Sequence, residues 1–204
     1  MACMPISPDC NLPTDMDNAV IAAIARWPNV PHVYGWLSLD RRGKWRLQGS
    51  PIDNAQVNGF IGRNYECDAR GAWFFQNGPQ RVYVQLDYTP WILRIGNQQE
   101  LATHTGKAVD DIRSALIDEN GDLLVAFGNT VGLIEDRDLP AMINAMVDDK
   151  GNSLDDDALA ALMQGTKSAA WLQLKAARIA ISTIFSSEVA GRYGFLPDPQ
   201  ADSE

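Results

Sequence analysis

The sequence predicts an α+β protein in which antiparallel β-hairpin repeats form sandwich- or barrel-like layers and a helical segment follows at the C-terminus. Two observations carry this prediction. Between residues 33 and 134, apolar and polar side chains alternate with a period of two, and turn residues recur at close spacing. This pattern is typical of antiparallel sheets. From residue 135 onward, the apolar residues recur at helical spacing instead.

An internal repeat marks the β-rich part. The pattern D-x-R-G-x-W-x-x-Q begins at Asp40 and again at Asp68, and a shorter copy begins at Asp118. Asp favours the first position of a type I turn and Gly supplies a positive φ, so each copy predicts a β-hairpin. Either Trp45 and Trp73 occupy equivalent places in related β units, or one continuous sheet contains both hairpins and the repeat reflects shared turn chemistry.

Three regions follow from these patterns: an N-terminal arm with a short helix (1–32), a β-rich domain with hairpin repeats (33–134) and a C-terminal helical region (135–204). In the first region, Asp17 is expected to cap a helix over residues 18–27. Residues 53–62 fit a short helix or an irregular turn, and the sequence leaves both open.

The C-terminal region predicts three helices. The first covers residues 138–147, and residues 148–152 form a linker. Ser153, with Asp156 three residues later, resembles the capping arrangement of a second helix that ends near Met163. The third helix is long, from residue 166 to about residue 190.

The long helix carries more apolar surface than one face of a surface helix needs. It fits either a helix packed between two layers or an oligomer interface. We expect a homodimer with this helix in or beside the interface, because symmetric dimers commonly cover such patches. The apolar residues concerned are Trp171, Leu172, Leu174, Ile179, Ile181, Ile184 and Phe185.

Composition restricts the partners and the compartment. The net charge of −9 and the pI near 4.6 disfavour nucleic acid and anionic membranes as partners. Three cysteines without C-x-x-C spacing predict neither a disulfide framework nor a zinc site. The N-terminus lacks the basic and apolar regions of a signal peptide, and no apolar run is long enough for a spanning helix. A cytoplasmic location is therefore expected.

The sequence shows none of the common catalytic motifs. His32 and His104 lie far apart without metal-ligand spacing, and there is no G-x-S-x-G or P-loop. Cys67 lies between Glu66 and Asp68, whose charges would raise a thiol pKa. The sequence thus predicts no metal and no cofactor.

One cluster of polar and aromatic residues remains as a candidate ligand site. Arg side chains bind carboxylates or phosphates through paired hydrogen bonds, and tyrosines add aromatic surface. On the strand around residues 81–88, alternate side chains point one way and are expected to line a ligand groove or form an ordinary polar strand face. The candidate ligand-binding residues are Arg63, Asn64, Arg81, Tyr83 and Gln85, near Tyr65 and Tyr88.

Residues 43–52, with the sequence GKWRLQGSPI, carry a G-x-W-x-x-x-G-x-P-I segment. This segment resembles the opening signature of a proteobacterial domain-of-unknown-function family. The resemblance covers about residues 33–134 and implies stacked β-layers with repeated motifs and a role in signalling. It carries no catalytic residue, and the C-terminal helical extension departs from the family pattern.

These observations favour a non-enzymatic binding or regulatory, signalling module with a small anionic ligand or a protein as partner. The alternative is an enzyme that acts on a small anionic metabolite through an Arg- and Tyr-lined pocket, since catalytic residues assemble in space. The two hypotheses predict different surfaces, and a shallow surface without a pocket would favour the module. An enzyme would gather Arg63, Arg81, Tyr83 or His104 around a carboxylate of perturbed pKa.

Overall fold

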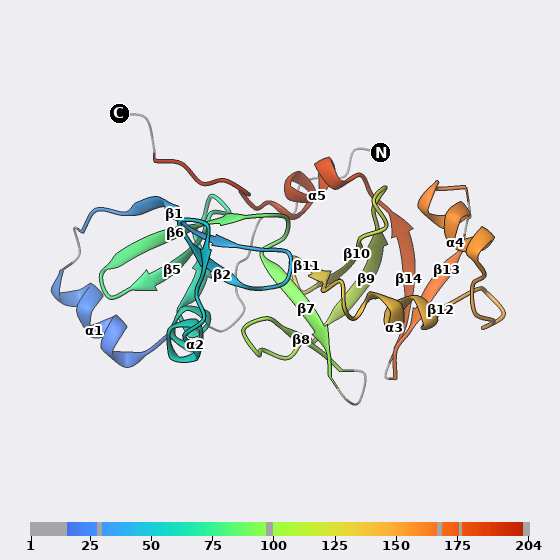
Figure 1. Cartoon of the computed structure of the whole chain (residues 1–204), viewed down its shortest axis with the longest axis horizontal. Helices are drawn as coiled ribbons and strands as arrows, with labels where there is room; N and C mark the ends of the chain where they lie inside the picture. The colour runs from blue at the N-terminus through green and yellow to red at the C-terminus, as the bar shows by residue number, and fades with distance from the viewer. Residues whose placement is uncertain (1–15, 28–29, 97–99, 167–168, 176, 202–204) are drawn as a thin grey trace. The chain divides into compact units, whose positions relative to one another are not determined.

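The chain forms two compact units. The computed structural model describes residues 16–27, 30–96, 100–166, 169–175 and 177–201 (Figure 1). The N-terminal unit runs to Pro90 and includes the chain from Tyr193 onward, whereas the C-terminal unit comprises Trp91–Arg192. The three regions expected from the sequence stay a prediction, and residues 1–15 of the expected N-terminal region lie outside the described residues.

The N-terminal unit is built on a six-stranded sheet. Its strand order is β3-β2-β1-β6-β5-β4, in which β1 and β6 are parallel and all other neighbours are antiparallel. The strands are β1 (Val33–Leu39), β2 (Trp45–Leu47), β3 (Ser50–Pro51), β4 (Tyr65–Cys67), β5 (Trp73–Asn77) and β6 (Gln80–Leu86).

Two helices accompany this sheet. The predicted first helix is confirmed as α1 (Asn18–Arg26), but the Asp17 side chain makes no capping hydrogen bond. The Asp17 carboxylate instead pairs with Arg63 at 3.2 Å. The segment that the sequence left undecided is α2 (Ala55–Arg63), and the Asn54 side chain caps it by accepting hydrogen bonds from the backbone N–H groups of Gln56 and Val57.

The C-terminal unit is built on an eight-stranded sheet. Its order is β12-β13-β14-β9-β10-β11-β7-β8, with parallel pairing between β11 and β7 and between β14 and β9. The strands are β7 (Trp91–Ile95), β8 (Leu101–Thr103), β9 (Ile112–Ile117), β10 (Leu123–Phe127), β11 (Thr130–Ile134), β12 (Met146–Val147), β13 (Ala170–Gln173) and β14 (Arg178–Thr183).

The two sheets repeat one topology. In the N-terminal unit, β4, β5 and β6 form a meander and β6 lies parallel to β1, which pairs with β2. In the C-terminal unit, β9, β10 and β11 form a meander and β11 lies parallel to β7, which pairs with β8. The expected α+β fold with hairpin repeats is thus confirmed, and the sheets are open rather than barrels.

Five turns of the described chain share one geometry. In each, the first residue donates its N–H to the carbonyl of the fifth residue, and the fourth residue, a glycine, donates to the carbonyl of the first. The side-chain oxygen of the first residue accepts the N–H of the fifth. These hydrogen bonds all lie within five residues, so local bonding closes each turn. The first residues are Asp40, Asp68, Thr103, Asp118 and Asp148.

The two Trp-bearing hairpins lie in one sheet, as β1–β2 and β4–β5. The alternative of a continuous sheet with shared turn chemistry is therefore the correct one for this pair. Trp45 and Trp73 nevertheless share a core, because both pack on the ring of Tyr65, with centroids 5.0 and 4.7 Å away.

The predicted long helix over residues 166–190 is wrong. Its apolar residues form the antiparallel strands β13 and β14, followed by the short helix α5 (Ser186–Tyr193). Ile179 and Ile181 are buried, and their neighbours Ala180 and Ser182 are exposed. This alternation is that of a strand with one covered face.

The homodimer stays a prediction, but the helix that was expected to form its interface does not exist. Leu172, Leu174, Ile179 and Ile181 are buried within the C-terminal unit. The apolar surface that motivated the dimer is therefore largely covered within one chain, with Phe185 as the main exception.

Residues 138–163 differ from the expected structure in three details. The helix expected over residues 138–147 is α3 (Leu139–Asn144), and β12 follows it. The predicted linker is the Asp148 turn described above. The next helix is α4 (Asp156–Met163), and its cap is Asp155 rather than Ser153, because the Asp155 carboxylate accepts the N–H of Ala158.

Cys67 is disulfide-bonded, contrary to the expectation that the cysteines form no such bond. The other cysteines, Cys3 and Cys10, lie outside the described residues. The cytoplasmic location stays a prediction. No helix in the described part of the chain is long and apolar enough to cross a membrane.

Candidate functional site

An apolar groove of about 460 Å³ opens on one face of the N-terminal sheet. Its volume lies within the range of small-molecule sites. Antiparallel pairing places Leu37 opposite Leu47 and Phe75 opposite Val82, so all four side chains lie on this face. The lining residues are Val33, Trp36, Leu37, Leu47, Ile52, Val57, Ile61, Phe75, Asn77, Gln80 and Val82.

An irregularity in β1 places Trp36 at the groove. Val33 pairs with Val82 and Leu37 pairs with Val84, so three residues of β1 lie opposite one residue of β6. Gly35 in this bulge has a φ of +73°, a conformation that other residues adopt at a cost. Bulges commonly redirect a side chain next to a functional site. The Trp36 side chain lines the groove and is 54% exposed.

Helix α2 forms the opposite wall. Val57 and Ile61 lie four residues apart on one helix face, and both line the groove. The start of the helix is fixed by the Asn54 cap and by Asn58, whose side-chain N–H donates to the carbonyl of Ile52 at 2.8 Å. The wall therefore rests on local hydrogen bonds that the sequence encodes.

The groove has little polarity. None of its described lining residues is charged, and Asn77 and Gln80 are the polar ones. The Gln80 amide N–H donates to the carbonyl of Pro31 at 2.9 Å. Three large apolar lining side chains are unusually exposed: Trp36, Leu47 (47%) and Val57 (42%). A clustered set of exposed apolar side chains marks a binding surface more often than scattered ones do.

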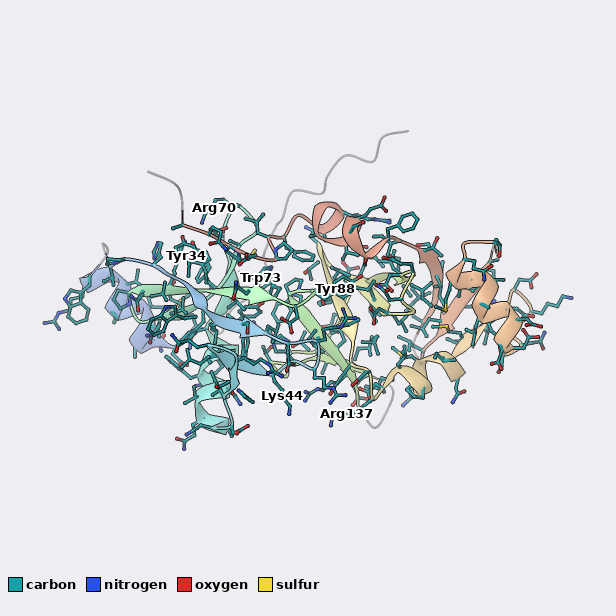
Figure 2. The ribbon with its side chains drawn as sticks, turned by 45° about the horizontal axis from the view of Figure 1, so that its top comes forward. Tyr34, Lys44, Arg70, Trp73, Tyr88 and Arg137 are labelled. Carbon is teal, nitrogen blue, oxygen red and sulfur yellow. The ribbon has the colours of Figure 1, made fainter. Side chains whose placement is uncertain are left out.

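The opposite face of the sheet holds part of the predicted ligand site. Tyr83 lies opposite Phe74, and its ring stacks on Tyr34, with centroids 4.5 Å apart. Its hydroxyl donates to Asp68 Oδ2 at 3.0 Å. The Arg81 guanidinium lies over the Phe74 ring at 4.4 Å. Arg70 joins this cluster beside Tyr34 (Figure 2).

The charges in this cluster satisfy one another. Hydrogen bonds to Tyr34 and Asp68 raise the pKa of Arg70. Burial acts to raise the pKa of Asp68, but hydrogen bonds from the backbone of Ala72 and Arg70 and from the Tyr83 hydroxyl lower it overall. Burial, with the charges of Arg81 and Arg70, lowers the pKa of His32. Asp68 thus already neutralises the cationic charge of Arg70.

The other three residues of the predicted ligand site join segments of the N-terminal unit through hydrogen bonds. Arg63 pairs with Asp17, and the buried Asn64 accepts the N–H of Asp17 and donates to the carbonyl of Phe60. These bonds tie the start of α1 to the end of α2. Gln85 donates to Asp198 at 2.7 Å and so holds the C-terminal segment. Their role in ligand binding stays a prediction.

Two cavities in the described part of the chain can be compared with the residues of the enzyme hypothesis. One is the groove of the N-terminal unit, and the other lies in the C-terminal unit. Neither is lined by Arg63, Arg81, Tyr83 or His104. Among the described residues, no group of three His, Cys, Asp or Glu side chains is placed to hold a metal ion.

Residues 16–200 match the family model described as "Protein of unknown function (DUF2946)". The chain belongs to this family. The expected resemblance to a family of unknown function is therefore confirmed, whereas the G-x-W-x-x-x-G-x-P-I segment itself is not tested. The DUF2946 description assigns no activity, and no curated protein matches the chain.

Two solved structures resemble this DUF2946 member, and both are DUF1285 family proteins. The protein from Silicibacter pomeroyi DSS-3 is 16% identical, with a TM-score of 0.49, over 76% of this chain and 85% of that chain. The protein from Shewanella baltica OS155 is 12% identical, with a TM-score of 0.42, over 53% of this chain and 91% of that chain.

Sequence reasoning missed the groove residues Trp36, Leu47 and Val57. Each belongs to a different element, and strand pairing or helix packing brings them together. A glycine inside a strand pattern suggests a bulge, so Gly35 was the local signal that pointed to this site.

Proposed function

We propose that this protein is a non-enzymatic binding module whose N-terminal unit accepts the hydrocarbon part of a small neutral molecule. The observation that carries the proposal is the exposed Trp36 on its bulge, facing an apolar groove of small-molecule size. Burying an exposed apolar side chain contributes roughly 1.5–3 kcal/mol. A ligand that covers the exposed parts of Trp36, Leu47 and Val57 therefore gains hydrophobic free energy on binding.

The lining supports a neutral ligand. A carboxylate or phosphate in this groove would meet no cationic side chain among the described lining residues. Burying an unpaired charge is costly. The amides of Asn77 and Gln80 at the groove offer partners for one hydroxyl or amide group of a ligand. A medium-chain alcohol has this chemistry.

A competition experiment tests the proposal. Nile red, a neutral dye that fluoresces in apolar surroundings, is bound to the intact protein and displaced with 1-decanol or with decanoate at pH 7.5. Decanol is expected to displace the dye at least tenfold more effectively than decanoate. Equal displacement, or better displacement by decanoate, would contradict a neutral, uncharged groove.

The small anionic metabolite of the enzyme hypothesis receives less support. The Arg70 and Arg81 side chains are engaged by Asp68, by tyrosines and by the Phe74 ring. An anion that binds there must compete with the ionised Asp68 carboxylate for Arg70. The binding-module proposal requires no such exchange.

A further inference from the structure

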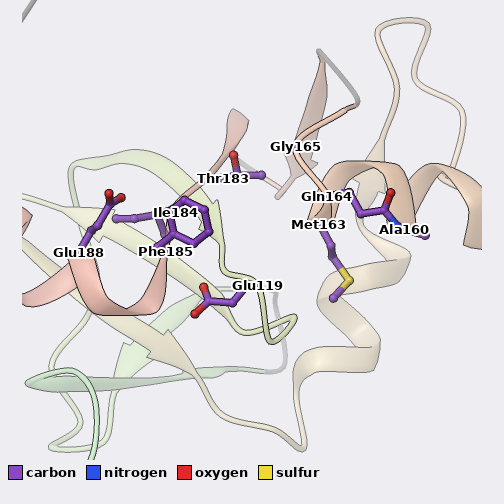
Figure 3. A pocket seen from close by; sticks show the side chains of 9 residues that line it. All are labelled: Glu119, Ala160, Met163, Gln164, Gly165, Thr183, Ile184, Phe185 and Glu188. Atoms are coloured by element: carbon purple, nitrogen blue, oxygen red, sulfur yellow. The ribbon is translucent and has the colours of Figure 1, made fainter.

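A second cavity, of about 660 Å³, lies within the C-terminal unit (Figure 3). It is bounded by the end of α4, the end of β14, the start of α5 and the turn between β9 and β10. Two large apolar side chains of the described part of this unit are notably exposed, Met163 (37%) and Phe185 (63%), and both line this cavity.

The lining of this cavity is acidic. Its described residues include Glu119 and Glu188 and no cationic side chain. Figure 3 shows Glu119 and Phe185 among the side chains that line the cavity, with Met163 reaching in from α4. An apolar surface with carboxylates at its edge complements a group that is cationic at one end and apolar along its body.

The Glu119 carboxylate is held in place. Glu119 is the second residue of the Asp118 turn, and its two carboxylate oxygens accept the N–H of Ser186 at 2.8 Å and the Ser186 hydroxyl at 2.5 Å. These hydrogen bonds lower the pKa of Glu119, with the Ser186 side chain as the main cause. Each oxygen keeps a second lone pair, so the ionised carboxylate can accept further hydrogen bonds.

We propose that this cavity receives an arginine side chain of a peptide partner, with the guanidinium group between Glu119 and Phe185. A guanidinium group binds a carboxylate in bidentate fashion and also stacks on an aromatic face. Its aliphatic stem would lie against Met163 and Ile184. A lysine ammonium is a compact, strongly hydrated charge and lacks the flat surface that fits the Phe185 ring.

The lining of this cavity fits contact with a partner that is larger than one side chain. Phe185 is 63% exposed, and Glu188 is exposed as well. A side chain that projects from a larger partner fills such an open site, and the rest of the partner covers the exposed Phe185. Arginine is also enriched at the centres of protein interfaces.

The test is a titration of the intact, isotope-labelled protein, followed by the chemical shifts of its backbone amides. The probe is the peptide acetyl-Leu-Arg-Leu-amide. The matched control peptide carries citrulline, the neutral isostere of arginine. We expect saturable shifts at Glu119, Ser186 and Phe185 with the arginine peptide, and at least tenfold weaker binding with the citrulline peptide.

Variants separate a specific site from general attraction to an acidic protein. Glu119→Gln and Phe185→Leu are each expected to weaken binding of the arginine peptide, Glu119→Gln by at least tenfold. Asp157→Asn removes an exposed carboxylate of α4 that does not line the cavity, and it should leave the affinity unchanged.

Three outcomes would overturn the proposal. The first is equal binding of the arginine and citrulline peptides, which tests the wild-type protein and needs no variant to fold. The second is an equal loss in Asp157→Asn and Glu119→Gln. The third is binding of ethylguanidinium alone as tight as that of the peptide, which would assign the cavity to a free small cation.

Discussion

Tyr34 and Tyr83 stack face to face, with ring centroids 4.5 Å apart and planes inclined by only 4°. Tyr83 is 2% exposed, although it lies on the strand face that carries Arg81 and Gln85. The polar face of β6 is therefore covered by an aromatic layer that Asp68 and Arg70 complete. We interpret this layer mainly as part of the scaffold that supports the groove on the opposite face.

Removing the Tyr83 hydroxyl should destabilise the fold. Tyr83→Phe keeps the stacked ring but deletes the hydrogen bond to the Asp68 carboxylate, which is worth about 1.5–3 kcal/mol for a charged partner. Urea denaturation measures the loss. In a double-mutant cycle with Asp68→Asn, the two losses should be less than additive, because both substitutions remove the same hydrogen bond. Strict additivity would show that this bond contributes nothing.

The Asp68 carboxylate should make stability depend on pH. Its folded-state pKa lies below the ordinary value of 3.8, so the unfolded chain binds its proton more readily. The resulting stabilisation is complete well above pH 3.8 and is lost as the pH falls through the folded-state pKa. The stability gap between wild type and Asp68→Asn should therefore be constant near neutral pH and shrink below about pH 4. A gap that widens on acidification would contradict this assignment.

Two equivalent turn glycines should respond differently to alanine. Gly71 and Gly151 both hold the fourth position of the shared turn, with φ of +81° and +86°. A Cβ at Gly151 meets no atom within 4 Å, so Gly151→Ala should cost only the backbone strain, about 1–2 kcal/mol. A Cβ at Gly71 would lie 2.0 Å from the carbonyl oxygen of Gly194.

Gly71→Ala should consequently cost about 1–3 kcal/mol more than Gly151→Ala, because the C-terminal segment must shift. Thermal or urea unfolding of the two variants measures the difference. Equal losses would mean that the close approach of the chain at Gly194 does not constrain the turn.

The Asn54 cap should matter for stability and for the groove. Asn54→Ala removes the acceptor of two backbone N–H groups and should cost about 1 kcal/mol. Because α2 carries Val57 and Ile61, Nile red binding should weaken as well. Gln56→Ala changes an exposed side chain of the same first turn and serves as the control. A similar effect of both substitutions would argue against the cap.

The hairpins could be predicted from the sequence because their determinants are local. Asp68 and Gly71 close their turn through hydrogen bonds within five residues, and the flanking strands alternate with a period of two. The same local chemistry operates at Asp148, where the sequence suggested only a linker, because the strand before that turn has just two residues.

The C-terminal strands could not be predicted in this way. In residues 170–183 the apolar side chains fit both a helical and a strand period, and short apolar runs do not distinguish the two. The deciding interaction is the pairing of Ile181 with Ala115 in β9, far away in the sequence. Long-range pairing also assembles the groove, since Trp36 and Val57 meet only when β1 and α2 are in place.

The groove around Trp36 is expected to bind apolar ligands. The most direct measurement compares the dissociation constant of Nile red for Trp36→Ala with that for Trp27→Ala. Trp27 is the matched control, because its side chain is 52% exposed and does not line the groove. Circular dichroism confirms that both variants fold, and Phe185→Ala shows whether the dye also occupies the other cavity.

We expect at least tenfold weaker binding for Trp36→Ala, since a tenfold change corresponds to about 1.4 kcal/mol, less than the indole contributes when it is covered. Binding by Trp27→Ala and Phe185→Ala should stay within twofold of wild type. Unchanged binding by Trp36→Ala, or an equal loss in Trp27→Ala, would contradict the assignment of the groove as the binding site.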